Sequence, residues 1–178
     1  MALLIRLAQA SDLPAINEIY NHYVVESTCT YQETPEPAEG RLAWFERHGA
    51  RHPVIVAERN GMVAGWGSLS PFHARSAYRF TVENSVYVHH AQHRQGIGDA
   101  LLGDLVTRAS TLGHRSIIAG IDSDQPASIA IHARHGFIKV GHLQRVGYKF
   151  DRWLDVIYMQ LTIASLDEGS NIPPRELR

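Results

Sequence analysis

The central part of the sequence reads ENSVYVHHAQHRQGIGDA over residues 83–100. Its segment Ser85–Val88 is rich in β-branched and aromatic residues, which favour a strand. A polar turn follows, and Gly96 and Gly98 let the backbone come close to a ligand as the chain enters a helix. The start of a helix offers unpaired N–H groups and the positive end of the helix dipole, which bind anions. With Arg94 beside them, these features predict a site for a pyrophosphate group.

Two common phosphate-binding motifs do not match this stretch. A dinucleotide-binding fingerprint needs G-x-G-x-x-G early in a βαβ unit, but the third glycine position is Leu101 and the turn lies in mid-chain. A P-loop is excluded because no Gly-Lys-Ser/Thr sequence follows a glycine loop. A strand-to-helix turn that binds nothing is the alternative from this fragment alone.

Length and composition are those of an ordinary globular domain. The chain has 178 residues, of which 44% are hydrophobic and 20% charged, so one domain with a substantial core is expected. The net charge of −1 does not favour binding to nucleic acid or to an anionic membrane. The one cysteine, Cys29, excludes an internal disulfide. With no apolar membrane span and no signal-peptide pattern, we expect a cytoplasmic protein with a domain over 1–163 and a flexible polar tail over 164–178.

Hydrophobic periodicity and turn residues predict the order of the elements. The predicted strands are 3–7, 54–58, 62–69, 78–88, 116–121, 137–143 and 153–162, and the predicted helices are 14–25, 38–48, 98–112 and 127–135. Asn60-Gly61 is a strong hairpin signal, and the long connection 26–37 is of a length that is often functional. This order predicts an α/β (α+β) domain with one mixed, twisted central sheet flanked by helices.

Several motifs then resemble a known family. The sequence His93-Arg94-Gln95-Gly96-Ile97-Gly98 is similar to (Q/R)-x-x-G-x-(G/A), the acetyl-CoA motif of the Gcn5-related N-acetyltransferase (GNAT) family, with His93 at the usual Gln or Arg position. The element order resembles the GNAT acyl-CoA N-acyltransferase fold over residues 3–162. Three longer segments resemble the phosphinothricin and methionine sulfoximine acetyltransferase branch; they are 72–78, 81–88 and 146–155, the last with Asp151 in place of a glycine.

The resemblance implies a reaction and a cofactor site. The expected activity is transfer of the acetyl group of acetyl-CoA to the α-amino group of a small amino acid or analogue, such as phosphinothricin, methionine sulfoximine or methionine sulfone, in a homodimer without a metal. The residues that it assigns to acetyl-CoA are Val86, Tyr87, Val88, His93, Arg94, Gln95, Gly96, Ile97, Gly98, Asp99, Ala100, Gln125 and Ser128. Gln125 stands where the family has an asparagine.

The catalytic residues follow from the chemistry and from the same resemblance. An ammonium group cannot attack a thioester, so a base must remove its proton, and Glu83 is the candidate. Because an ordinary glutamate has a pKa near ~4.3, burial must raise that pKa, or a water must relay the proton. An ion pair of Glu83 with Arg75 or Arg79 is the structural alternative. His132 stands where many relatives have a tyrosine that protonates the leaving thiolate; a packed helix residue is its alternative. The backbone N–H of Val88 or a neighbour is expected to stabilise the oxyanion.

We expect the substrate-binding residues to lie on two loops. Arg75 can hold an anionic group through two parallel N–H···O bonds. The other residues expected at the substrate pocket are Phe72, Tyr78, Arg79, Thr30 and Tyr31, and the resemblance assigns Lys149, Phe150 and Trp153 to the dimer interface and the pocket rim.

Other chemistries have weaker support. His89, His90 and His93 suggest a metal site, but no cysteine or carboxylate set accompanies them. Cys29 as a nucleophile would need a histidine partner that the sequence does not specify. We therefore expect direct transfer, with no metal, and keep acetylation of a peptide or protein, or a non-catalytic acyl-CoA sensor, as alternative functions.

Overall fold

The computed structural model describes residues 2–164, in which seven strands form one sheet in the order β1-β2-β3-β4-β5-β7-β6. The strands are β1 (Leu4–Leu7), β2 (Val54–Arg59), β3 (Met62–Pro71), β4 (Thr81–Val88), β5 (Ser116–Asp122), β6 (Ile138–Lys149) and β7 (Arg152–Thr162). All neighbours are antiparallel except β4 and β5, which are parallel. The predicted tail lies outside the described residues, apart from residue 164.

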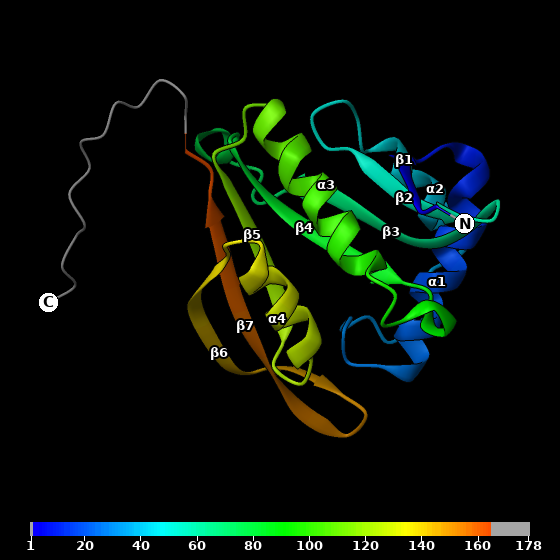
Figure 1. The fold of residues 1–178 in the computed structure, drawn as a ribbon. Helices are drawn as coiled ribbons and strands as arrows, with labels where there is room; N and C mark the ends of the chain where they lie inside the picture. Colours follow the sequence, from blue (N-terminus) through cyan, green and yellow to red (C-terminus); the bar gives the residue numbers. More distant parts are fainter. Residues whose placement is uncertain (1, 165–178) are drawn as a thin grey trace, which may run out of the picture.

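Helices cover both faces of the sheet (Figure 1). Helices α1 (Leu13–Glu26) and α2 (Ala38–Glu46) pack on one face, and α3 (Ile97–Thr111) and α4 (Pro126–Arg134) pack on the other. Within the described residues, no helix is long and apolar enough to cross a membrane. The predicted mixed α/β sheet flanked by helices is confirmed.

Strand β2 shows why the sheet needs helices on both sides. Successive side chains of a strand point to opposite faces. Ile55 and Ala57 therefore join the cluster beneath α3, while Val54 and Val56 join the cluster beneath α1. All four residues are at most 4% exposed, so this short apolar run contributes to two separate hydrophobic layers.

Strands β4 and β5 diverge. Only Thr81–Glu83 pairs with Ser116–Ile118, although β4 continues to Val88 and β5 continues to Asp122. Backbone groups on the facing edges beyond this point have no partner in the sheet ladder, and buried backbone groups require partners. The fold thus opens a gap at its centre with hydrogen-bonding edges on both sides.

Two predicted boundaries were wrong. The strand expected from Tyr78 begins at Thr81, because Ser76–Tyr78 forms a 3₁₀ turn in which Tyr78 N–H donates to Arg75 O at 3.0 Å. Strand β6 continues to Lys149, beyond its predicted end at residue 143. Its register shifts between Leu143 and Gly147, and such bulges interrupt the alternation on which the prediction depended.

Candidate active site

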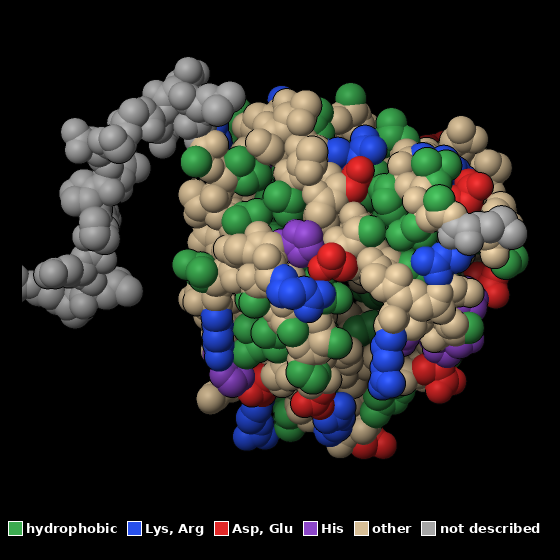
Figure 2. Space-filling model, viewed as in Figure 1, with side chains coloured by type: hydrophobic (Ala, Val, Ile, Leu, Met, Phe, Trp, Pro, Cys, Tyr) green, Lys and Arg blue, Asp and Glu red, His purple; other side chains and the backbone are tan. Residues whose placement is uncertain are grey.

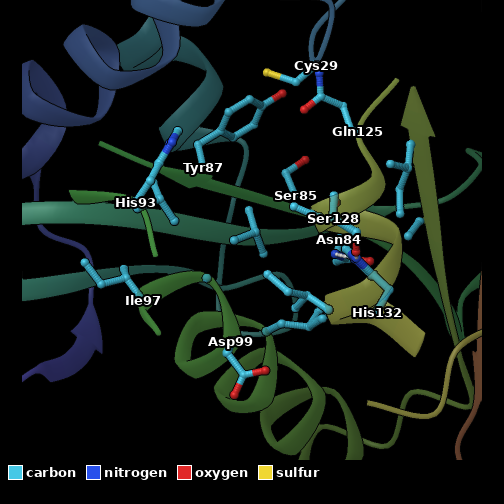
Figure 3. Close-up of a pocket in the computed structure, with 18 of the residues that line it drawn as sticks. Cys29, Asn84, Ser85, Tyr87, His93, Ile97, Asp99, Gln125, Ser128 and His132 are labelled. Carbon is cyan, nitrogen blue, oxygen red and sulfur yellow. Dashed lines mark hydrogen bonds between the residues drawn. The ribbon is translucent and has the colours of Figure 1, made fainter. Parts of the chain in front are cut away.

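A cavity of about 740 Å³ opens where β4 and β5 separate, within the size range of small-ligand pockets. It is lined by residues of α1, β4, β5, the start of α3 and one side of α4. Figure 2 shows the corresponding face of the molecule hollowed between α4 and the N-terminal end of α3, with positive and negative side chains interspersed around it. Figure 3 shows the lining in detail.

The start of α3 forms one end of the cavity. Gly96 has a φ of 77°, in the left-handed region that glycine adopts readily, and Arg94 has a φ of 60°. Ala100 N–H donates to Gly96 O at 3.0 Å, so the N–H groups of Ile97, Gly98 and Asp99 precede the first intrahelical bond and lack helical partners. The lining includes Arg94, Gly96, Ile97 and Gly98, which is the arrangement that an anionic pyrophosphate requires.

The backbone of β4 presents donors and acceptors to the gap. His89 N–H donates to Ala64 O on the β3 side at 2.9 Å, and bonded pairs alternate along an antiparallel ladder. Val86 and Val88 therefore direct their backbone groups to the open edge facing β5. Both residues line the cavity.

Tyr23 of α1 closes the cavity beside His93. The Tyr23 hydroxyl donates to Val88 O, and His93 Nε2 lies 2.6 Å from the hydroxyl oxygen of Tyr23, with the rings of Tyr23 and His93 stacked. Burial raises the pKa of Tyr23 to about 12, so the hydroxyl keeps its proton. The sequence did not single out Tyr23 as a site residue, because helical spacing does not reveal where a hydroxyl points.

Asp99 lines the cavity but is engaged with α4. Its Oδ1 accepts from Arg134 Nη2 at 3.0 Å and from His135 Nε2 at 3.2 Å, and the bond from Arg134 is the main cause of the lowered pKa of Asp99. In Figure 3 its carboxylate points away from the other labelled side chains. Arg134, which the sequence did not single out, also lines the cavity and adds a positive charge there.

Gln95 and Ala100, both expected to bind acetyl-CoA, lie outside the cavity lining. The Gln95 side chain accepts from Arg59 on the exposed side of the turn. Ala100 is already within the first turn of α3, with its N–H bonded to Gly96 O. Gln95 is flanked by Arg94 and Gly96, both with left-handed backbone, and its side chain is directed away from the gap.

Glu83 lies at the last paired position before β4 and β5 diverge, and it lines the cavity. Burial raises the pKa of its carboxyl, partly opposed by the charge of His73. Its Oε1 lies beside Gly120 of β5, 3.6 Å from where a Cβ on that glycine would be. Among residues 2–164, Glu83 forms no ion pair with Arg75 or Arg79, so the structural alternative is not found.

His132 is buried and fully bonded. Its Nδ1–H donates to Ser128 O at 2.8 Å, which leaves Nε2 to accept from Asn84 Nδ2 at 2.9 Å (Figure 3). Burial also lowers the pKa of His132, so the neutral ring is favoured. In this form Nε2 carries no proton for a thiolate, and the edge of the ring packs on Phe137. The arrangement fits the packed-residue alternative better than the general acid.

The loop that was predicted to bind the substrate, residues 72–79, lies outside the cavity lining. Phe72, Arg75, Tyr78 and Arg79 are outside the cavity lining. The rings of Phe72 and Tyr78 pack with His73, and exposed Arg75 precedes the 3₁₀ turn. The sequence did not predict this turn, which changes the course of residues 72–79. Of these residues, only His73 affects the pKa of Glu83, which its charge lowers.

Thr30 and Tyr31 are also outside the lining, while their neighbour Cys29 is part of it. Thr30 directs its hydroxyl to Tyr20 at 2.9 Å. Figure 3 shows Cys29 close to Tyr87 and Gln125 at the end of the cavity opposite Ile97. Burial raises the pKa of the Cys29 thiol, which keeps it protonated and unsuited to nucleophilic attack.

The histidines of the turn do not converge. His90 stacks on His22 with ring centroids 4.0 Å apart, whereas His93 faces Tyr23. In the part of the chain that the structure describes, no group of three or more His, Cys, Asp or Glu side chains is arranged to hold a metal ion.

Comparison with known proteins agrees with this geometry. The model of the Acetyltransferase (GNAT) family matches residues 16–137. The chain belongs to the GNAT acetyltransferase family. This GNAT chain is 41% identical to the L-methionine sulfoximine/L-methionine sulfone acetyltransferase of Salmonella typhimurium, over 89% of this chain and 94% of the relative. It is also 41% identical to the L-amino acid N-acyltransferase MnaT of Escherichia coli, over 94% and 98% of the two chains.

A solved structure extends the likeness to three dimensions. The phosphinothricin acetyltransferase of Sinorhizobium meliloti, in complex with acetyl-CoA, superposes with a TM-score of 0.89 at 39% identity, covering 99% of this chain and 95% of that one. The predicted family, branch and GNAT fold are confirmed, and the protein is an N-acetyltransferase.

Proposed function

We propose that this GNAT enzyme acetylates the α-amino group of a small amino acid or analogue of the phosphinothricin, methionine sulfoximine or methionine sulfone type. The transfer is direct, from acetyl-CoA to the amine, with Glu83 as general base. The observation that carries the proposal is the half-buried carboxylate of Glu83 at the fork of β4 and β5, in the same cavity as the start of α3. The relatives' named substrates support the choice of amine.

The cofactor fits the cavity from the start of α3 inward. The free N–H groups of Ile97 and Gly98, together with Arg94, suit its pyrophosphate. The pantetheine arm has amide groups that match the open backbone edge of Val86 and Val88. The thioester then lies near the fork, where Glu83 lines the cavity.

The reaction requires two proton movements. The ammonium group of the substrate loses one proton to Glu83, and the free amine attacks the thioester carbon to form the new C–N bond. The backbone N–H of Val88 is oriented to the gap and can donate to the oxyanion. When the C–S bond breaks, the second nitrogen proton neutralises the thiolate, directly or through solvent. His132 is not needed as an acid in this scheme; in its neutral form it orients Asn84.

The proposal is tested by measuring thiol release from acetyl-CoA with a panel of amines. The panel contains phosphinothricin, methionine sulfoximine, methionine sulfone, the common amino acids and short peptides. Turnover confined to the glutamate-like and methionine-like compounds is expected. Preference for peptides would favour the peptide-acetylation alternative. Tight acetyl-CoA binding with no turnover on any amine would favour the sensor.

We also propose that Arg75 binds the anionic group of the substrate, although Arg75 lies outside the cavity lining. The Arg75→Ala variant is expected to raise the KM for the amine with little change in kcat, because it removes ground-state binding. An unchanged KM for the amine would show that Arg75 does not bind the substrate. Arg47→Ala, at the exposed residue directly after α2, is the control.

The enzyme is also proposed to be a cytoplasmic homodimer. Strand β6 is an edge strand, and Val146, Tyr148, Phe150 and Trp153 near its hairpin are each at least 51% exposed. An exposed apolar patch on an edge strand is a typical association surface. Sedimentation should give a dimer mass, and Trp153→Glu should shift it to a monomer; a monomeric native protein would contradict the proposal.

A further inference from the structure

Lys149 at the end of β6 is buried. It is 2% exposed, although the family resemblance predicts a place at the dimer interface or the pocket rim. Its Nζ donates to Ser27 O at 2.7 Å and to Thr30 O at 2.8 Å. Burial lowers the pKa of this ammonium group. A buried cation is tolerated only when hydrogen bonds replace its hydration, and here both acceptors belong to one short segment, 27–30.

Tyr31 provides a second attachment of the same segment. Its ring lies against Gly147 of β6 so closely that a Cβ on this glycine would come within 2.5 Å of the ring. Its hydroxyl lies 2.8 Å from Asp122 Oδ2 and 3.1 Å from Asp155 O. The end of β6 and the two strands β5 and β7 therefore hold residues 27–31 from one side.

The held segment forms part of the cavity wall through Cys29. Cys29 N–H donates to Ser27 Oγ at 3.1 Å, so its backbone lies directly between the two carbonyls that bind Lys149. Figure 3 places Cys29 beside Tyr87. Tyr87 and Glu83 share one face of β4, because strand residues two or four apart point the same way. The segment thus walls the cavity on the face of the proposed base.

We propose that Lys149 is a positioning residue for the amine substrate. By binding both ends of the Cys29 turn, it fixes the distance between residues 27–31 and the Glu83 face of β4. This distance sets the size of the amine that fits beside the base. The amine part of this inference rests on the proposed function, whereas the positioning part does not.

The positioning part can be tested without any activity. Cys29 is the only cysteine of the chain, so its rate of reaction with a disulfide reagent such as DTNB reports the position of the segment. The Lys149→Met variant keeps the side-chain length and removes the ammonium group. Loss of hydrogen bonds from a charged donor should speed Cys29 modification by about tenfold. Lys139→Met, an exposed lysine of the same strand, should leave the rate unchanged.

A second variant provides the test if the Lys149→Met protein does not fold. Gly147→Ala places a Cβ against the Tyr31 ring, which must move, and it keeps the lysine. It should also speed Cys29 modification. An unchanged Cys29 rate in a folded Lys149→Met protein, or in Gly147→Ala when Lys149→Met does not fold, would overturn the proposal.

The amine part is tested by separating substrate and cofactor affinities. Lys149→Met should raise the KM for the amine at least several-fold while the Kd for acetyl-CoA stays within about twofold. An equal loss of acetyl-CoA affinity would contradict a role on the amine side. If the native enzyme turned over no amine of the panel, the proposed function would fail, while the Cys29 rates would still decide the positioning part.

Discussion

The two ends of the cavity are built in different ways. The end proposed to bind acetyl-CoA comes from one contiguous stretch, residues 93–98, whose local backbone leads into the start of α3. The end proposed to bind the amine is assembled from distant segments: Lys149 binds a carbonyl 122 residues earlier, and Tyr31 binds Asp122, 91 residues later. The first end depends on local geometry and the second on tertiary contacts. Substrate choice can therefore change by substitutions that leave acetyl-CoA binding intact.

The largest expected effect concerns the residue at which the two ends meet. Glu83→Gln removes the base but keeps the shape, so kcat/KM should fall by about 10²- to 10⁴-fold, as for other general bases. The Kd for acetyl-CoA, measured by calorimetry, should stay near that of the native enzyme. Equal losses of turnover and cofactor affinity would indicate a structural role, and exposed Glu46→Gln serves as the matched control.

A smaller effect is expected at the cofactor end. Arg94→Ala removes a charged donor from the pyrophosphate site, so the Kd for acetyl-CoA should rise by about 10- to 100-fold. The KM for the amine at saturating acetyl-CoA should hardly change. A rise in that KM with no change in cofactor affinity would reverse the assignment of the two ends.

The smallest effect is expected at the amine end. Tyr31→Phe keeps the ring against Gly147 but removes the hydroxyl that binds Asp122. One lost neutral-to-charged hydrogen bond should raise the KM for the amine by about fivefold. Steady-state kinetics with both substrates varied would show this, and exposed Tyr148→Phe on β6 should have no such effect. An unchanged KM for the amine would show that Tyr31 does not help to form the substrate site.

The same contrast explains what the sequence could predict. The element order and the glycine turn before α3 follow from short-range patterns, and the comparisons confirm the family. The binding of an anion at Gly96 and the role of Glu83 stay predictions. The burial of Lys149 could not be predicted, because a lysine is almost never fully buried unless it has partners. The acceptors that make its burial possible lie in another segment, 27–30.

His132 and Arg75 illustrate the limits of transferring a motif. The position of His132 indicated an acid, but its tautomer is set by the backbone carbonyl of Ser128, and its Nε2 is occupied by Asn84, a contact that the motif leaves unspecified. The loop of Arg75 was expected beside the cavity, but a 3₁₀ turn in its course redirects it. In both cases the motif specified the residue, and its surroundings determined what the side chain contacts.

The pH dependence of kcat/KM tests the role of Glu83 most directly. Because burial raises the pKa of Glu83, and the base must be ionised, the rate should fall as the pH drops through a pKa above the ordinary value of ~4.3. The ionisation of the substrate amine adds a separate limb at higher pH. The fall in rate at low pH (the acidic limb of the profile) should disappear in Glu83→Gln. The same limb in native enzyme and variant, with similar rates above it, would contradict the assignment of Glu83 as the base.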